Sequence, residues 1–393
     1  MSVTVSQRLQ LVKPSPTMAV AALATELKAQ GRPIIDLGAG EPDFDTPPHI
    51  RAAAIQAIEQ GDTRYTLVEG TTALKQAIIA KLKRDNGLDY TPDQIVASSG
   101  AKQCCYNIAL AVLNAGDEAI VPAPYWVSYP DMIRLADAEP VIVTAGMADG
   151  FKITARTLAA ALTDRTRLLF LNSPGNPTGA VYSRTEWEAL ASVLREYPRV
   201  VIAADEIYEH IFWGREPYTS FAAACPELQE RTVTINGVSK GYAMTGWRIG
   251  YAAGPKSIIG AMKKLQGQCT SNPCTISQAA AVAALTGDMG CVHEMAATFR
   301  TRHDFLVAAL NTLPGVRCLA VDGAFYAFPD VTGAMRQTGA ADDAAFAELL
   351  LRECNVAVVP GSAFGAPGHI RLSYACSVEL LREAVDRIRQ LLG

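Results

Sequence analysis

The sequence has no apolar run long enough to cross a membrane and no segment typical of export. Its longest apolar runs, such as residues 200–204, fall far below the roughly 20 residues that a membrane-spanning helix needs. The first residues, MSVTVSQRLQLVKPSP, hold neither a long apolar core nor the cleavage site of a secretory signal. We therefore expect a soluble cytoplasmic protein without a membrane partner.

An excess of charge of one sign is also missing. The 35 Lys and Arg residues and 39 Asp and Glu residues give a formal net charge of −4, spread without runs of like charge. Proteins that bind nucleic acid usually gather positive charge on one surface, so this balance predicts no nucleic-acid partner. Small acidic substrates remain possible, because a local pocket can be cationic on an anionic protein.

The nine cysteines do not have the spacing of a disulfide framework. Cys104 and Cys105 are adjacent, the other spacings are irregular, and there is no CxxC pair. This usage is typical of a reducing compartment. Cys269, Cys318 and Cys354 lie in apolar stretches and are expected to be small buried side chains.

Two common site motifs are incomplete. His293 and Glu294 lack the second histidine of a zinc-protease helix, and the five histidines are scattered. Gly38-Ala-Gly40 lacks the third glycine of a dinucleotide-binding loop. We therefore expect neither a metal site nor a dinucleotide site.

The central part of the chain alternates short apolar runs with helix-length amphipathic segments, from about residue 48 to residue 285. Most runs are continuously apolar, as expected for strands that helices cover on both faces. The alternation predicts an α/β domain with a mostly parallel sheet. The seven expected strands are residues 94–98, 118–121, 140–143, 168–172, 200–204, 232–236 and 249–253.

The two ends of the chain are expected to form a smaller α+β domain. A helix over residues 19–30 and a strand over 34–37 precede the proline- and glycine-rich stretch GAGEPDFDTPPH, which reads as a crossing loop. A long helix begins near residue 289, and a final amphipathic helix ends the chain. Between them we expect strands at 325–328, 356–359 and 370–374. The predicted division is an N-terminal segment at 1–47 that joins the small domain, a large domain at 48–288 and the small C-terminal domain at 289–393.

The most informative stretch is NGVSKGYAMTGWRIGY, which contains Lys240 and Arg248. Its lysine lies between small residues just after a buried strand, where α/β proteins place active sites. Beside cationic or apolar groups a lysine loses part of its proton affinity and can form an imine as a nucleophile. Arg248 offers a guanidinium fork suited to a phosphate. Taken alone, such a lysine is more often an ordinary solvated side chain.

Other motifs also follow predicted strands. The strand VVIAAD ends in Asp205, which by itself would fit a helix N-cap. The stretch NSPGNPTG, which contains Asn176, could be a tight connection. The stretch SSGAKQ at residues 98–103 opens a helix, whose first backbone N–H groups can bind a phosphate.

These motifs together resemble one family. SKGYAMTGWRIGYAAGP resembles the cofactor-lysine segment of class I, fold type I aminotransferases in the aspartate aminotransferase family, which depend on pyridoxal 5'-phosphate. The resemblance covers essentially the whole chain and is to the bacterial 1β-type branch, some of whose members are prephenate aminotransferases. It implies a large domain with a mostly parallel seven-stranded sheet sandwiched by helices, plus a smaller α+β domain.

The resemblance also implies an activity. The enzyme would move an amino group from an L-amino acid, most simply aspartate or glutamate, to a 2-oxo acid such as 2-oxoglutarate or oxaloacetate, by a ping-pong mechanism. Lys240 would hold the cofactor as an imine and then carry the proton between substrate and cofactor. Asp205 would pair with the pyridinium nitrogen, so that the ring can accept electrons.

Further cofactor contacts are implied by the same matches. Tyr208 and Asn176 would hydrogen-bond the phenolic oxygen, and Trp126, in APYWVSY, would stack on the ring. Ala101 replaces a glycine that is common in close relatives, which leaves the backbone donors in place. The expected contacts around the phosphate are Gly100, Ala101, Lys102, Ser239 and Arg248.

The substrate contacts are implied in the same way. Apolar residues alternate along GHIRLSY, so Arg371 points away from the apolar face. Taken alone, it would fit a surface arginine on an exposed strand. In the family, the matching arginine binds the α-carboxylate of the substrate. Gly40 would make a backbone contact. Lys102 would read a distal carboxylate, or else only neutralise the phosphate. Lys13 matches a basic residue of relatives that transaminate prephenate, or is a solvated lysine. Trp126 and Asn176 are also expected to contact the substrate.

The assembly and the rival functions follow from the same resemblance. Tyr65, in TRYT, aligns with a tyrosine that reaches the phosphate of the neighbouring subunit, which predicts a homodimer with shared active sites. The alternatives are an aminotransferase with prephenate or aromatic substrates and a pyridoxal-phosphate-dependent carbon–sulfur lyase. A transcription regulator with an aminotransferase-like domain would need a DNA-binding extension. A catalytically silent binding protein would not be expected to keep every chemical residue.

Overall fold

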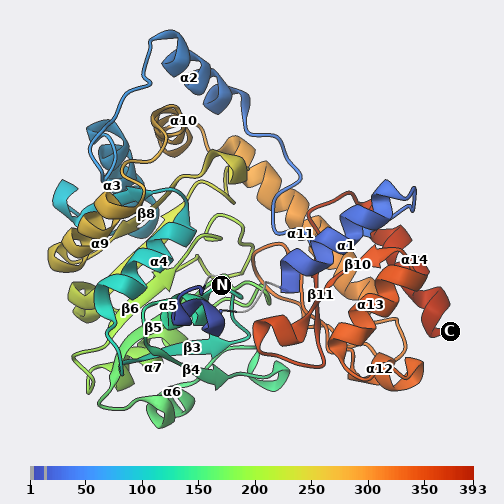
Figure 1. Ribbon diagram of the computed structural model, residues 1–393. Helices are drawn as coiled ribbons and strands as arrows, with labels where there is room; N and C mark the ends of the chain where they lie inside the picture. The colour runs from blue at the N-terminus through green and yellow to red at the C-terminus, as the bar shows by residue number, and fades with distance from the viewer. Residues whose placement is uncertain (1–3, 13–15) are drawn as a thin grey trace.

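A seven-stranded sheet is the largest element of the computed structural model, which describes residues 4–12 and 16–393 (Figure 1). The strand order is β2-β8-β7-β6-β5-β3-β4. Only β8 runs antiparallel to its neighbours β2 and β7, and the other neighbouring pairs are parallel. The predicted mostly parallel sheet is confirmed. Its strands are β2 (Ile95–Ser98), β3 (Glu118–Ala123), β4 (Glu139–Thr144), β5 (Thr166–Asn172), β6 (Val201–Asp205), β7 (Thr232–Gly237) and β8 (Gly250–Ala253).

Helices cover both faces of this sheet. Along β3, Ala119 and Val121 pack into one hydrophobic cluster, whereas Ile120 between them packs into another on the opposite face. This alternation is the two-residue period of a strand. The first face is covered by α4 (Ala101–Val112), α5 (Tyr129–Leu135) and α9 (Lys256–Cys269). The second is covered by α6 (Ala155–Ala161), α7 (Arg184–Leu194) and α8 (Phe221–Ala224).

A third group of helices lies beyond β2 and β8. It contains α2 (Pro48–Glu59), α3 (Thr72–Asn86) and α10 (Thr275–Thr286), and Figure 1 shows α2 beside α10 at one edge of the molecule. The sequence sets both ends of α3. The Thr71 side chain accepts a hydrogen bond from the backbone N–H of Leu74, and Gly87 takes a left-handed conformation at φ 68°. The apolar side of this helix packs with side chains of β2 and β8 in one hydrophobic cluster.

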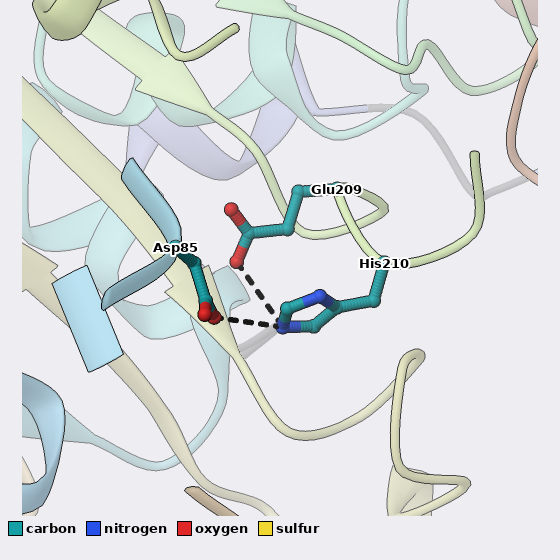
Figure 2. Close-up of side chains that lie close together, drawn as sticks. All are labelled: Asp85, Glu209 and His210. Carbon is teal, nitrogen blue, oxygen red and sulfur yellow. Dashed lines mark ion pairs between the residues drawn. The ribbon is translucent and has the colours of Figure 1, made fainter. Parts of the chain in front are cut away.

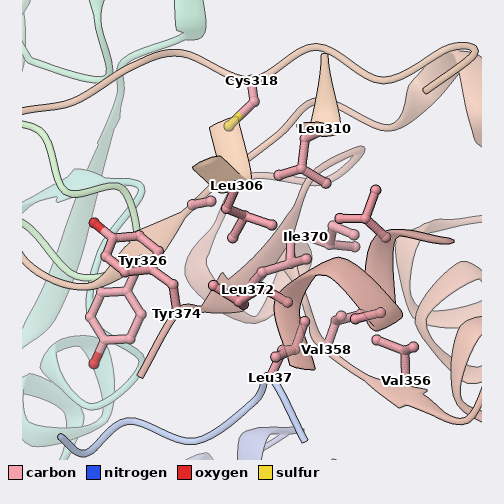
Figure 3. Packing of buried hydrophobic residues seen from close by; sticks show 14 of the residues in the cluster. Leu37, Leu306, Leu310, Cys318, Tyr326, Val356, Val358, Ile370, Leu372 and Tyr374 are labelled. Carbon is pink, nitrogen blue, oxygen red and sulfur yellow. The ribbon is translucent and has the colours of Figure 1, made fainter. Parts of the chain in front are cut away.

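The two ends of the chain meet in a smaller core at the right of Figure 1. Leu37 packs there beside Leu306, Leu372 and other apolar residues from the last hundred positions (Figure 3). Near the N-terminus, β1 (Ile35–Asp36) pairs in parallel with β10 (Val356–Ala357). The helices of this part are α1 (Pro16–Ala29), α11 (Gly290–Leu310), α12 (Thr332–Thr338), α13 (Asp343–Glu353) and α14 (Val378–Leu392). The exact domain boundaries stay a prediction.

One predicted strand of this part is wrong. Residues 356–359 form two strands, because β10 pairs with β1 whereas β11 (Val359–Pro360) pairs antiparallel with β12 (Ile370–Ser373). An earlier strand of the chain, β9 (Tyr326–Ala327), pairs with the other side of β12 and completes a three-stranded sheet. Arg371 lies in the central strand of that sheet, and all four β12 residues are buried.

Two smaller expectations have different outcomes. Cys318 and Cys354 are buried as predicted, but Cys269 is exposed, because it is the last residue of α9 and lies beyond that helix's contacts with the sheet. Of the helices in the described part of the chain, none is both long and apolar enough to cross a membrane.

Candidate active site

A cavity of about 810 Å³ opens where the central parallel strands end. Asp205 is the last residue of β6 and pairs in register with Asn172, the last residue of β5. Lys240 follows β7 by three residues. The carboxyl ends of parallel strands are where α/β folds collect polar side chains. The predicted site residues that line the cavity are Gly40, Ala101, Lys102, Trp126, Asn176, Asp205, Tyr208, Ser239, Lys240, Arg248 and Arg371.

Lys240 reaches into this cavity with an altered proton affinity. Its ammonium contacts the carbonyl oxygen of Gly40 and lies 5.9 Å from the centre of the Tyr208 ring. Burial and then the positive charge of Arg371 lower the pKa of Lys240 to about 8, against the opposing effect of Glu41. A sizeable fraction of the amine is therefore neutral near pH 8 and can act as a nucleophile or base.

Asp205 is a buried carboxylate that neutral groups hold. The Tyr129 hydroxyl donates to its Oδ2 at 2.6 Å, the Ile207 backbone N–H donates to Oδ1 at 3.2 Å, and the Cys105 thiol lies 3.8 Å from Oδ2. Burial raises the pKa of Asp205 despite the Tyr129 hydrogen bond. Within the described residues, no Lys, Arg or His lies within 4.0 Å of this carboxylate. The carboxylate therefore has room for a cationic partner from a ligand.

Arg371 lines the same cavity and is held by several contacts. Its Nη1 donates to Asn176 Oδ1 at 3.0 Å and its Nη2 to the Gly38 carbonyl oxygen at 2.7 Å. The guanidinium lies 4.6 Å from the centre of the Tyr326 ring and 5.0 Å from that of Phe364. Its Nε is buried without a hydrogen-bond partner. The arginine is thus held rigidly by neutral groups, with donors left for an anion.

A cationic corner lies where α4 begins. Gly100 caps this helix at φ 92°, and a Cβ there would collide with the Arg248 guanidinium. Arg248 itself has a φ of 56°, a strained value for a residue with a side chain. The Lys102 ammonium lies 5.2 Å from the centre of the Trp126 ring, and burial and then Arg248 lower its pKa. Backbone donors and two cations together make a site for a phosphate.

Two predicted site residues, Gly100 and Tyr65, do not line the cavity, and a third falls outside the described residues. Gly100 is not part of the lining, but its lack of a side chain leaves space for the Arg248 guanidinium. Tyr65 is 91% exposed and does not line the cavity. Lys13 falls outside the described residues.

Two tyrosines were missed as site residues. Tyr129 binds Asp205, and the Tyr326 hydroxyl shares a 2.8 Å hydrogen bond with that of Tyr208. Tyr129 lies in APYWVSY, three residues after Trp126, and its backbone N–H donates to the Trp126 carbonyl oxygen at 3.1 Å, so the same motif carries both residues. Tyr326 had no such signal, because it reaches the site from β9, more than a hundred residues from Tyr208.

Comparison with known proteins agrees with this geometry. Residues 32–388 match the family model described as aminotransferase class I and II. The aspartate/prephenate aminotransferase of Nitrosomonas europaea is 53% identical over 99% of both chains, and that of Cereibacter sphaeroides is 52% identical over 98% of this chain and 97% of its own.

Solved structures show the same arrangement of the chain. The aspartate aminotransferase of Rhizobium meliloti superposes with a TM-score of 0.95 at 43% identity, over 99% of this chain and 98% of its own. That of Thermus thermophilus with maleate superposes with a TM-score of 0.94 at 43% identity over all of both chains.

The chain belongs to the aminotransferase class I and II family, and its fold is fold type I. It is therefore an aminotransferase, and membership of the family implies dependence on pyridoxal 5'-phosphate.

Proposed function

We propose that this chain binds pyridoxal 5'-phosphate and moves the amino group of aspartate or glutamate to a 2-oxo acid. The observation that carries the proposal is the arrangement of Lys240, Asp205 and Arg371 around one cavity. The lysine has a lowered pKa, the aspartate lacks a cationic partner within the described chain, and the arginine has unused donors. Each of these features matches a different part of the cofactor or of an amino acid.

The residues present fit the cofactor. A phosphate would lie at the start of α4, between the backbone N–H groups there and the Arg248 guanidinium. Asp205 would hold a protonated ring nitrogen, and such a pairing would counter the rise in the pKa of Asp205 that burial causes. Asn176 and Tyr208 would bind the ring oxygen, Trp126 would cover the ring face, and Ser239 lies beside Lys240 in the lining.

When bound, the cofactor supplies an electron sink for the bond that breaks at the substrate α-carbon. Lys240 would hold the cofactor through its amine. The same amine would carry the proton at the substrate α-carbon, first as a base and then as an acid. A pKa of about 8 suits this task, because an efficient acid–base group has a pKa near the working pH.

The charges of the cavity support a dicarboxylic amino donor. Arg371 would bind the α-carboxylate, which all amino acids share, and the Gly40 backbone would contact the same substrate. Lys102 lines the cavity from the first turn of α4 and has no acidic partner within 4.0 Å among the described residues. An ammonium on a flexible stem can meet carboxylates of different reach. The structural neighbour from Thermus thermophilus, whose ligand is the dicarboxylate maleate, agrees with this proposal.

A homodimer with shared sites is part of the proposal. Tyr65 is 91% exposed, and Leu67 and, on α2, Ile55 and Ile58 are also exposed apolar side chains. An exposed group of this kind is unfavourable in water and typical of an interface. A second copy of the chain that covered it would bring Tyr65 to the partner's phosphate corner.

Two narrower alternatives remain. The relatives from Nitrosomonas and Cereibacter carry prephenate in their names, so prephenate is a second acceptor to test, and Lys13 is its proposed contact. Glutamate or aspartate incubated with prephenate should then yield arogenate. A carbon–sulfur lyase would instead release ammonia and pyruvate from a suitable donor, so product analysis separates the two classes.

The test of the proposal is a titration of the purified protein with candidate amino acids. Aspartate and glutamate should change the absorption spectrum of the bound cofactor and yield the matching 2-oxo acids. Borohydride reduction of the enzyme should fix the cofactor to Lys240, and Lys240→Ala should still bind cofactor but lose transamination by many orders of magnitude. A borohydride tag on any other lysine would contradict the assignment.

A further inference from the structure

A buried polar cluster lies outside the cavity, centred on Glu209 (Figure 2). Glu209 Oε1 accepts from the Lys81 ammonium and, at 2.8 Å, from Asn236 Nδ2, and Oε2 accepts from Asn86 Nδ2 at 2.9 Å. The side chains of Lys81 and Glu209 are 1% and 3% exposed. None of these four side chains lines the cavity. An ion pair buried this deeply is costly to desolvate, and because it does not line the cavity, direct contact with a ligand does not explain it.

A bound metal ion does not explain the cluster. Asp85, Glu209 and His210 offer ligand atoms within 4.8 Å of one another (Figure 2). The Lys81 ammonium, however, contacts Glu209 and lies 3.7 Å from Asp85, so it already supplies the positive charge that the carboxylates need. Burial favours a higher pKa for Glu209, but Lys81, then His210 and the Asn86 hydrogen bond outweigh it and hold the pKa at about 2.

The cluster joins the two chain segments that carry Tyr208 and Lys240. Tyr208 lines the cavity, and Glu209 after it points into the cluster. Asn236 lies in β7, four residues before Lys240, and binds the same carboxylate. One side chain, Glu209, thus ties both segments to α3 through Lys81.

The residues that follow Glu209 and Lys240 also pack closely against each other. A Cβ on Gly241, the residue after Lys240, would lie only 3.1 Å from the His210 side chain. The rings of His210 and Tyr242 meet edge to face with centroids 5.6 Å apart. A shift of the 208–210 segment would therefore be passed directly to the backbone beside Lys240.

We propose that Glu209, with Lys81 as its counter-ion, is a positioning residue that sets the place of Lys240 relative to Tyr208 and the cofactor. The inference rests on the proposed function. Loss of the Glu209 carboxylate would leave the buried Lys81 ammonium with only Asp85, 3.7 Å away, as its counter-ion, so the two segments would move until water reached it. The Lys240 amine would then sit differently among Arg371, Glu41, Arg248 and Asp205, the groups that set its proton affinity.

The test is Glu209→Gln in the cofactor-loaded enzyme, a change that keeps the size of the side chain. We expect kcat to fall by roughly 10- to 100-fold, the loss associated with a displacement of about 1 Å at a reacting group. The KM for the amino donor should stay unchanged, because Arg371 and Lys102 are untouched. The pH midpoint of the visible absorption of the bound cofactor should shift by about one unit, since the environment of Lys240 changes.

A matched control lies on the same helix. Lys75 on α3 forms an ion pair with Glu69 at 3.3 Å, and its side chain is 9% exposed. Among the described residues it forms no ion pair or hydrogen bond with residues 208–242. Lys75→Met should leave both kcat and the spectral midpoint at their wild-type values. If Glu209→Gln does not fold, Asn236→Ala decides, because it removes the 2.8 Å hydrogen bond without stranding a charge.

The outcomes are separable. A variant with a lower melting temperature but wild-type kcat and spectral midpoint would show a purely structural cluster and overturn the inference. An equal spectral shift in Lys75→Met would also overturn it. A wild-type enzyme without a lysine-dependent absorption would instead overturn the proposed function itself.

Discussion

Arg371→Lys is the substitution whose effect follows most directly from the site. A guanidinium has five N–H donors, and Arg371 uses one for Asn176 and one for the Gly38 carbonyl oxygen. The remaining donors form a fork that can bind both oxygens of a carboxylate, whereas an ammonium is a single point of charge. The variant should therefore lose about one charge-assisted hydrogen bond, or roughly 1.5–3 kcal/mol. This corresponds to a loss in kcat/KM of about 10- to 100-fold.

The assay is kcat/KM with aspartate, glutamate, alanine and an aromatic amino acid. The loss should be the same for each donor, because all share the α-carboxylate. Arg134→Lys is the control: Arg134 lines the same cavity, but it is 38% exposed and pairs with Asp131 at 3.0 Å. Wild-type kcat/KM in Arg371→Lys, or a loss no greater than in the control, would refute the assigned role.

The remaining predictions concern the cofactor, the donor and the assembly. Asp205→Ala should cost about 3–5 kcal/mol, mostly in the proton-transfer step, because it leaves the ring nitrogen without its buried counter-ion; near-normal single-turnover rates would contradict this. Lys102→Ala should raise the KM for aspartate and glutamate about 10- to 100-fold and spare alanine, whereas a uniform loss with weaker cofactor binding would assign Lys102 to the phosphate. Mixing inactive Lys240→Ala chains with damaged Tyr65→Ala chains should restore activity in heterodimers, and sedimentation that shows a fully active monomer would exclude shared sites.

The large sheet was predictable because its strands are buried on both faces. Continuous apolar runs such as residues 168–172 and 200–204 leave a strong signal, and their order with intervening helices indicates parallel pairing. The small part of the molecule was harder. Residues 356–359 look like one strand, but their partners come from β1, near the N-terminus, and from β12. Nothing local in the sequence records that choice of partners.

The sequence motifs predicted many of the residues that line the cavity, and they were less informative where distant segments meet. The alternating pattern around Arg371 indicated which way the side chain points. It did not show that the rings of Tyr326 and Phe364 flank the guanidinium or that the residue is buried. The same limit applies to Glu209, which follows the motif residue Tyr208 and whose lysine partner lies on a helix more than a hundred residues earlier.

The net charge of the cavity lining differs from that of the whole protein, and the proposed binding of ligands depends on this difference. The chain has a formal net charge of −4, yet one cavity is lined by the cations Lys102, Arg134, Lys240, Arg248 and Arg371 and by the carboxylates Glu41, Asp131 and Asp205. Each of these charges is costly in a partly desolvated space. The ionic parts of the proposed ligands are of opposite sign at each position: the phosphate at Arg248, the ring nitrogen at Asp205 and the α-carboxylate at Arg371. Binding would thus relieve the electrostatic cost of the folded site, and the same relief would favour ligands that carry all three groups over those that carry one.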